Sequence, residues 1–335
     1  MGIRVTVVAV GVVVALTFGL LPGADIIRSV FDQVTDGVAE GQAVSAFVSP
    51  SQGVTTLIDQ VYRQDDPDAL LDVYFPDSAN RLGMTLPAVV WIHGGGWVTG
   101  RKDDAADYFR LIASEGYTVI SLDYSLAPAM RYPTPIHQVN DALMYIQANA
   151  ARFHVDVNRI VMAGDSAGAQ IASQVAVMIT DPAFAAEMQI TPALKPAQLR
   201  GVVLHCGIYD MRVLLEKAGY APLKIYGWNT HTIVRAYAGS DAWNAPALRQ
   251  MSTLNHVTAD FPATFITGGN DDRLTNDQSL PLAQKLARLG VKVTALFYPE
   301  DHRPPLGHEY QFRLEQADAQ ITLAKTVVFL KQQTS

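Results

Sequence analysis

A chain of 335 residues with 49% apolar side chains can bury a large hydrophobic core in one large or two small domains. Its net charge of −7 argues against a nucleic-acid-binding protein, because such a protein needs a basic face to neutralise phosphates. The single cysteine, Cys206, excludes an intrachain disulfide and any cluster of cysteine ligands. It lies in the strand-like run GVVLHC, where a lone cysteine is usually a core residue.

The N-terminus carries an uncharged apolar run from Val5 to Leu21, preceded by Arg4. Its length lies between those of a signal-peptide core and a membrane-spanning helix. We therefore expect residues 1–24 to be a signal peptide or an N-terminal membrane anchor, and residues 25–50 to be a linker. A buried core helix is the alternative, although such a helix would normally show a polar stripe. The expected location is exported: periplasmic, extracellular, or anchored to the membrane with the folded domain outside.

Residues 51–335 are expected to form one folded domain. Eight short, strand-like runs occur in it: Val54–Arg63, Leu70–Pro76, Ala88–His93, Tyr117–Asp123, Arg159–Gly164, Gly201–Cys206, Ala263–Gly268 and Lys292–Pro299. Helical patterns lie between or after them: Ala105–Ser114, Ile136–Ala151, Ala167–Ile179, Asp277–Leu289 and Ala317–Lys331. This alternation predicts an α/β protein with a mostly parallel sheet and helices on both faces. Residues 209–261 break the rhythm, are rich in aromatic side chains, and are expected to form an insertion over one edge of the sheet.

The first motif with chemical content is MAGDSAG, which contains a Gly-x-Ser-x-Gly pattern centred on Ser166. The pattern alone is weak, because a glycine- and serine-rich turn can produce it by chance. A strand-like run leads into it and an alanine-rich helical pattern leads out. This context indicates a sharp strand–turn–helix bend that exposes the hydroxyl of Ser166 as a nucleophile.

The second motif is WIHGGGWVTG, in which three consecutive glycines follow a predicted strand. Glycine loses more conformational entropy on folding than other residues do, so three in a row indicate a structural or functional requirement at this place. Backbone N–H groups of Gly95 and Gly96, with that of Ala167, could stabilise a developing oxyanion. A flexible turn is the alternative, and a phosphate-binding loop is disfavoured because no P-loop or GxGxxG pattern is present. His93 is expected to brace this loop.

Together these motifs resemble the α/β-hydrolase superfamily, and within it the hormone-sensitive-lipase-like bacterial carboxylesterases, near the feruloyl or acetyl-xylan esterase-like branch. The resemblance runs from about Leu70 to Leu330 and includes LDVYFP, HGGGWVTGRKDD, DYSLAPAMRYPTPIHQVNDAL and GDSAG in that order. It implies an α/β-hydrolase fold with a mostly parallel eight-stranded sheet, helices on both faces, and a small cap or insertion. The sequence departs from the family at Ser125 and Ala129, where members often carry Arg and Glu.

The resemblance also implies an acid that lies between the serine and a histidine in the chain and follows a late strand. The run FITGGNDDRLTNDQS provides two adjacent candidates, of which at most one can point at the histidine. The family pattern Gly-x-x-Asp, with Gln-Ser seven residues later, favours Asp271. Asp272 is the alternative, because DRL resembles the Asp-Pro-Leu of other members.

Two histidines, His302 and His308, follow the last predicted strand. His302 matches the shorter loop of many relatives. Gly307 permits a sharp turn just before His308, and HEYQF resembles the histidine motif of the esterase-like branch. We therefore expect His308 to be the base, with His302 as the alternative.

These features predict a serine carboxylesterase in which Ser166, His308 and Asp271 form a catalytic triad and Gly95, Gly96 and Ala167 an oxyanion hole. The expected partner is a small-molecule ester, without nucleic acid, metal ion or organic cofactor, and with possible membrane attachment through the N-terminal segment. The oligomeric state is left open. A serine peptidase of the same fold and a catalytically inactive hydrolase fold used as a binding module are the alternatives.

Overall fold

The computed structural model describes residues 53–219, 225–242 and 244–335. The expected signal peptide or anchor, residues 1–24, and the linker, residues 25–50, lie outside this part of the chain. Within the described ranges, no helix is both long enough and apolar enough to cross a membrane.

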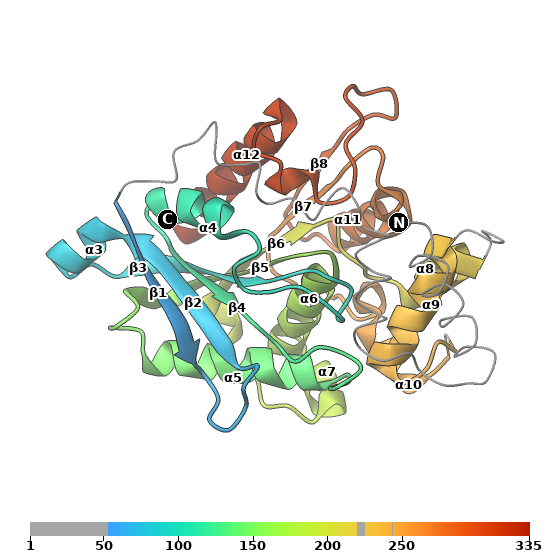
Figure 1. Ribbon diagram of the computed structural model, residues 1–335, viewed down its shortest axis with the longest axis horizontal. Helices are drawn as coiled ribbons and strands as arrows, with labels where there is room; N and C mark the ends of the chain where they lie inside the picture. The colour runs from blue at the N-terminus through green and yellow to red at the C-terminus, as the bar shows by residue number, and fades with distance from the viewer. Residues whose placement is uncertain (1–52, 220–224, 243) are drawn as a thin grey trace, which may run out of the picture.

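One eight-stranded sheet forms the centre of the molecule (Figure 1). The strands are β1 (Val54–Val61), β2 (Leu70–Pro76), β3 (Leu86–Ile92), β4 (Thr118–Leu122), β5 (Val155–Asp165), β6 (Leu199–His205), β7 (Thr264–Gly268) and β8 (Val293–Phe297). Their order is β1-β2-β4-β3-β5-β6-β7-β8. β2 pairs antiparallel with β1 and with β4, and the neighbours from β4 to β8 are parallel. The predicted strands and the mostly parallel sheet are therefore confirmed.

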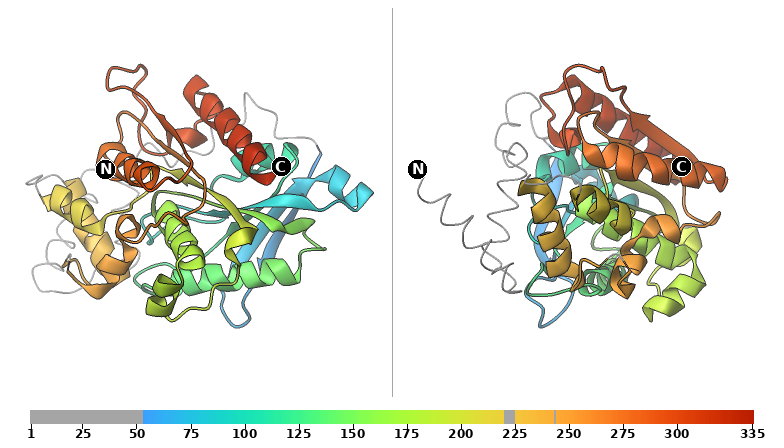
Figure 2. Two further views of the ribbon diagram at one scale, coloured as in Figure 1. Left: turned by 180° about the vertical axis from the view of Figure 1, so that it is seen from behind. Right: turned by 90° about the vertical axis from the view of Figure 1, so that its right-hand side faces the viewer.

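Helices cover both faces of the sheet (Figures 1 and 2). They are α3 (Asp77–Leu82), α4 (Ala106–Ser114), α5 (Thr134–Ala148), α6 (Ser166–Thr180), α7 (Pro182–Met188), α8 (Met211–Gly219), α9 (Ile225–Ala238), α10 (Pro246–Met251), α11 (Leu280–Arg288) and α12 (Ala317–Thr334). Four single turns also occur in the described ranges: η2 (Pro196–Gln198), η3 (Thr253–Asn255), η4 (Thr275–Ser279) and η5 (Tyr310–Phe312). The five predicted helices correspond to α4, α5, α6, α11 with η4, and α12.

The two faces of the sheet carry separate hydrophobic cores because side chains alternate along each strand. In β3, Val89 and Trp91 pack in the core under α4 and α12. Val90 and Ile92 pack in the core under α5, α6 and α11. A strand buried on both faces has no polar alternation, which is why β3 to β7 read as nearly continuous apolar runs.

The insertion, residues 209–261, contains α8, α9 and α10. The sequence predicts that it covers one sheet edge, but its described contacts lie elsewhere. Tyr237 on α9 stacks on Trp97 in the loop after β3, and α10 packs on α6. The edge strands are β1 and β8, so the insertion lies beside the carboxyl ends of the central strands instead. Of the aromatic residues that suggested an insertion, Tyr220 and Trp243 lie outside the described residues.

Candidate active site

Four loops that carry the predicted site residues leave parallel strands of the sheet. β3 ends before the glycine run, β5 before Ser166, β7 before the two candidate aspartates, and β8 before the two candidate histidines. Because parallel strands end at the same edge of a sheet, these loops meet there. The remaining question is which side chains come into contact.

Ser166 lies at the bend between β5 and α6. Its φ angle is 49°, in the left-handed region that non-glycine residues rarely adopt. The flanking glycines allow this bend, since a Cβ atom on Gly164 would lie 2.6 Å from the carbonyl carbon of Gly168. A Cβ atom on Gly168 would lie 2.0 Å from the carbonyl oxygen of Ile92, at the end of β3. The Gly-x-Ser-x-Gly pattern therefore packs the start of α6 directly against the start of the glycine-rich loop.

His308 joins Ser166 to an aspartate through two hydrogen bonds. Its Nε2 atom lies 3.0 Å from Ser166 Oγ, and its Nδ1 atom lies 2.8 Å from Asp272 Oδ2. The Leu274 N–H group donates to Asp272 Oδ1 at 2.9 Å, which fixes the carboxyl group from its other side. This arrangement suits proton transfer from the serine hydroxyl to the imidazole.

The contact with His308 is made by Asp272 and not by Asp271, the aspartate that the sequence favours. Asp271 donates its backbone N–H to Leu306 O at 2.9 Å, and its side chain is exposed. The backbone of Asp271 therefore faces the histidine loop while its carboxylate faces solvent. The next residue then points its side chain inward, and Asp272 is only 8% exposed.

His302 takes part in a separate contact. Its Nε2 atom lies 3.1 Å from Asp318 Oδ2, and its ring packs on Tyr298. It therefore lies apart from the hydrogen-bonded chain of Ser166, His308 and Asp272.

The glycine-rich loop presents backbone N–H groups without intramolecular acceptors. Gly95 and Gly96 have φ angles of 98° and 58°, and their N–H groups donate no hydrogen bond within the described part of the chain. A Cβ atom on Gly95 would lie 2.2 Å from Thr99 O, so only glycine fits there. The N–H of Ala167 lies in the first turn of α6, where helical N–H groups lack an intrahelical acceptor. These are the donors that the sequence assigns to an oxyanion hole.

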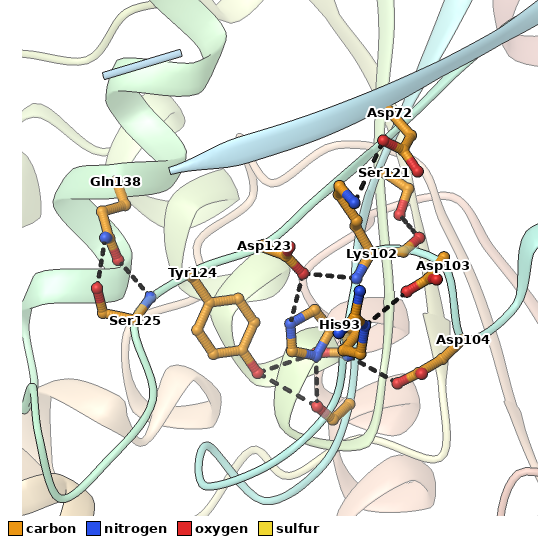
Figure 3. A network of polar contacts seen from close by, with 12 residues as sticks. Asp72, His93, Lys102, Asp103, Asp104, Ser121, Asp123, Tyr124, Ser125 and Gln138 are labelled. Carbon is orange, nitrogen blue, oxygen red and sulfur yellow. Dashed lines mark hydrogen bonds and ion pairs between the residues drawn. The ribbon is translucent and has the colours of Figure 1, made fainter. Parts of the chain in front are cut away.

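A buried polar network holds this loop in place (Figure 3). The ring of His93 stacks on Tyr124 with centroids 4.3 Å apart, and its Nδ1 atom lies 2.8 Å from Gly94 O. The Tyr124 hydroxyl donates to His93 O at 3.0 Å. Burial lowers the pKa of His93 below its ordinary value of 6.5, so the ring is neutral at pH 7. These contacts suit the bracing role that the sequence assigns to His93.

The electrostatic surroundings of His308 favour its charged form. Burial lowers the pKa of His308, whereas contact with the Asp272 carboxylate raises it above its ordinary value. Burial raises the pKa of the Cys206 thiol to about 11, so Cys206 is protonated at neutral pH. The charge that stabilises an imidazolium at His308 therefore belongs to Asp272.

Sequence reasoning missed that Cys206 belongs to this site. Its Sγ atom, an Asp272 oxygen and a His308 nitrogen lie within 4.8 Å of one another. Such a group could in principle hold a metal ion, but the histidine and the carboxylate are already hydrogen-bonded to each other. Cys206 lies just after β6 with a φ angle of 42°, and no local sequence pattern indicates that its thiol reaches the site.

Comparison with known proteins identifies the family. The BD-FAE family model matches residues 71–286, which is more than half of the chain. The chain belongs to the BD-FAE family. A protein of Acanthamoeba polyphaga mimivirus whose name assigns it to the alpha/beta hydrolases is 36% identical over 116 residues. That match covers 33% of this chain and 34% of the viral protein, so it spans only about a third of that relative.

Solved structures resemble this BD-FAE protein over nearly its whole length. Inhibited esterase B from Lactobacillus rhamnosis gives a TM-score of 0.77 at 22% identity, covering 91% of this chain and 96% of its own. A bacterial heroin esterase gives 0.69 at 21% identity and covers 96% of both chains. A thermostable carboxylesterase cloned from a metagenomic library gives 0.68 at 19% identity, covering 94% of this chain and 98% of its own. The protein therefore has the α/β-hydrolase fold.

Proposed function

We propose that this protein is a serine carboxylesterase that hydrolyses small carboxylic esters through a covalent acyl-enzyme. The observation that carries the proposal is the hydrogen-bonded chain from Ser166 Oγ through His308 to Asp272. The names of the similar solved structures, esterases in each case, agree with it. Two solved structures of esterase B from Lactobacillus rhamnosis carry inhibitors, and the inhibitor in one of them is a tributyrin phosphonate.

In this proposal, Ser166 is the nucleophile and His308 is the general base. His308 Nε2 accepts the hydroxyl proton of Ser166 as Oγ attacks the ester carbonyl carbon. The resulting imidazolium then donates this proton to the departing alcohol. Water enters next and transfers a proton to His308 while it attacks the acyl-enzyme. His308 then returns this proton to Ser166 Oγ as the bond between Oγ and the acyl carbon breaks, and the acid product leaves.

Asp272 orients the imidazole and stabilises its charged form. Its carboxylate accepts the Nδ1–H of His308, so the lone pair of neutral His308 lies on Nε2, toward Ser166. Asp272 thus takes the role that the sequence favours for Asp271.

The oxyanion of the tetrahedral intermediate would lie among the N–H groups of Gly95, Gly96 and Ala167. Preorganised donors of this kind stabilise charge that develops in the transition state, at about 3 kcal/mol for each donor removed. Packing of Gly168 against the end of β3 keeps the glycine-rich loop next to Ser166.

Hydrolysis of p-nitrophenyl butyrate tests the proposal with wild type, Ser166→Ala, His308→Ala and the control His302→Ala. We expect Ser166→Ala and His308→Ala to lose at least about four orders of magnitude in kcat. His302→Ala should stay close to wild type, because its contact is with Asp318. Circular dichroism of each variant separates loss of catalysis from loss of folding.

Three results would contradict the proposal. If His302→Ala is the inactive variant, the base is misassigned. If wild type cleaves peptides but not esters, the peptidase alternative holds. If a fluorophosphonate fails to label Ser166, the serine is not activated, and the binding-module alternative holds.

We further propose that the protein is exported, with residues 1–24 as a signal peptide or membrane anchor. The support is the apolar run that begins at Val5 after Arg4. Mass spectrometry of the N-terminus of protein from the native membrane fraction tests this. An intact N-terminus found only in the cytosol would contradict it.

A further inference from the structure

Two further carboxyl groups converge beside the proposed catalytic residues. Asp165 directly precedes Ser166, and Glu309 directly follows His308. A Cβ atom placed on Gly94 would lie 2.3 Å from Asp165 Oδ2 and 2.9 Å from Glu309 Oε1. Both oxygens therefore point at the same spot on the glycine-rich loop, one residue before Gly95.

Asp165 is fixed by two N–H donors. The indole Nε1 of Trp91 donates to Oδ1 at 2.8 Å, and the backbone N–H of Gly94 donates to Oδ2 at 2.8 Å. The residue is 6% exposed. Asp165 thus ties the end of β5 to the start of the glycine-rich loop.

Glu309 reaches the same place from the histidine loop. Its φ angle is 56°, a left-handed conformation that turns the chain sharply between His308 and η5. Its Oε1 atom lies 3.6 Å from His308 Nε2, the nitrogen that also contacts Ser166 Oγ. The side chain is 13% exposed.

Neither carboxyl group is neutralised by a lysine or arginine within the described part of the chain. Among the residues that the structure describes, the ion pair that involves either one is the contact of Glu309 with His308. Two unprotonated carboxylates that face each other in a buried place repel strongly, so a proton between them is favoured. In agreement, burial, the charge of Glu309, and a hydrogen bond with Glu309 raise the pKa of Asp165 well above its ordinary value.

The other titratable groups around the pair supply no positive charge that could neutralise the second carboxylate in place of this proton. Two phenols and a thiol face it, and burial raises the pKa of each, so all three are neutral at pH 7. Burial also raises the pKa of the one further carboxyl group that faces it. These groups are Tyr108, Tyr124, Cys206 and Asp104. Among the described residues, the group in contact with the pair that can carry a positive charge is His308.

We propose that Asp165 and Glu309 share one proton and, as a carboxyl–carboxylate pair, position the Gly94–Gly96 loop and the His308 loop around Ser166. The inference rests on the proposed esterase function, since it gives both residues a positioning role at that site. With one shared proton, the pair carries a single negative charge and cross-links two loops that meet at the ester. Loss of that proton at alkaline pH leaves two charges, which push Glu309 away from Asp165 and loosen the glycine-rich loop.

The pH dependence of kcat tests the pair, with Glu309→Gln as the decisive variant. A glutamine amide can donate permanently to the Asp165 carboxylate, and the total charge of the pair stays at one. We expect Glu309→Gln to keep kcat within about threefold of wild type at neutral pH, and to move the alkaline decline of kcat upward by about one pH unit or more. Glu309→Ala should lower kcat about tenfold with little change in KM, because Asp165 loses its partner.

Two further variants sharpen the comparison. Asp165→Asn should lose more activity than Glu309→Gln, because Trp91 and Gly94 both donate to Asp165 and an amide offers only one acceptor. Glu315→Gln is the matched control, since Glu315 is exposed further along the same segment. Its pH profile should be that of wild type. An alkaline decline that is identical in wild type and Glu309→Gln would overturn the proposal.

Thermal unfolding gives a readout that needs no catalysis. Because the folded-state pKa of Asp165 is raised, its protonated form stabilises the fold at low pH, and this contribution is lost as pH rises through the raised value. Glu309→Gln removes the charge of Glu309, so its Tm should rise relative to wild type as pH increases. If wild type hydrolyses no ester, the proposed function fails, and the Tm comparison alone decides the pair. If the Tm of wild type and that of Glu309→Gln change in parallel with pH, the proposal of a shared proton is rejected.

Discussion

The indole ring of Trp97 stacks on the ring of Tyr237 with centroids 5.0 Å apart and an interplanar angle of 5°. Trp97 belongs to the loop after β3, one residue beyond Gly96, and Tyr237 belongs to α9 of the insertion. Trp97 Nε1 also donates to Gln170 Oε1 on α6 at 3.2 Å. The insertion therefore contacts the proposed oxyanion loop through Tyr237, and it contributes to the site although none of its described residues is assigned a catalytic role.

Tyr237→Ala should weaken both the fold and catalysis. Loss of a fully buried aromatic ring costs about 3–5 kcal/mol in the free energy of unfolding, and Trp97 loses its stacking partner. Tyr237→Phe is the control, because the Tyr237 hydroxyl is buried and no described residue bonds it. We expect Tyr237→Phe to be as stable as wild type or up to about 1 kcal/mol more stable. Urea unfolding and kcat measure these effects, and a Tyr237→Phe variant as unstable as Tyr237→Ala would contradict this account.

Asp272→Asn should remove most of the activity, whereas Asp271→Asn should not. An asparagine at 272 would no longer hold the Nδ1–H of His308 in place, and an incorrect tautomer of the base lowers kcat by about three to four orders of magnitude. The same exchange at the neighbouring residue changes an exposed side chain. Steady-state hydrolysis of p-nitrophenyl butyrate by the two variants is the measurement.

The pH profile of kcat/KM further distinguishes the roles of Asp271 and Asp272. In the proposed mechanism His308 must be neutral to accept a proton, and Asp272 raises its pKa, so the kcat/KM of wild type should decline in acid as His308 becomes protonated. Residual activity of Asp272→Asn should show this decline at lower pH, because the stabilising carboxylate is gone. Asp271→Asn should retain the wild-type profile. If kcat/KM falls equally in Asp272→Asn and Asp271→Asn, the contact of Asp272 with His308 has no special role in catalysis.

The sequence predicted the sheet, the five main helices and Ser166 because these features depend on local patterns. Apolar runs, helical periodicity and the Gly-Asp-Ser-Ala-Gly bend are encoded in consecutive residues. The choice between Asp271 and Asp272 depends instead on backbone direction in a tight loop. That direction is set by the bonds of Asn270 and Asp271 to Leu306, on the distant histidine loop.

Contacts between distant segments account for the other differences. The carboxyl groups of Asp165 and Glu309 meet only because β5 and the loop after β8 end at the same side of the sheet. The aromatic composition of the insertion predicts that its side chains are buried, but it does not indicate which surface of the sheet the insertion covers. Neither relationship leaves a periodic signal in the sequence.

Lys102→Met should destabilise the protein strongly. The ammonium group of Lys102 is buried and lies 2.9 Å from Asp59 Oδ1. It also lies 3.4 Å from Asp72 Oδ1 (Figure 3), and the Asp72 carboxylate is buried as well. Removing the cation leaves Asp72 without its charge partner, which typically costs about 3–5 kcal/mol. Arg101→Met is the matched control, because the contact of Arg101 with Asp103 is exposed and such pairs contribute at most about 1 kcal/mol. Urea unfolding of both variants distinguishes the two cases, and similar losses would contradict the difference in burial.

The stability of the fold should fall in acid because of His205. Its ring is fully buried between β6 and its neighbours, with Nδ1 3.1 Å from Thr267 Oγ1 and Nε2 3.1 Å from the Tyr108 hydroxyl. Burial lowers its pKa to about 3 in the folded state. Below about pH 6.5 the unfolded chain therefore binds a proton that the folded protein does not. Stability is fully present above this pH and decreases as pH falls toward about 3, by at most about 1.4 kcal/mol per pH unit.

Urea unfolding at about pH 7.5 and about pH 4.5 measures this contribution when wild type is compared with His205→Gln. Wild type should lose more stability between the two pH values than His205→Gln, which has no imidazole to protonate on unfolding. The quantity to compare is the change in the free energy of unfolding between the two pH values. His205→Gln also changes the packing, but this effect is the same at both pH values and cancels. His137→Gln, at an exposed position of α5, should lose as much as wild type. An equal loss in wild type and His205→Gln would mean that His205 is protonated in the folded protein as readily as in the unfolded chain.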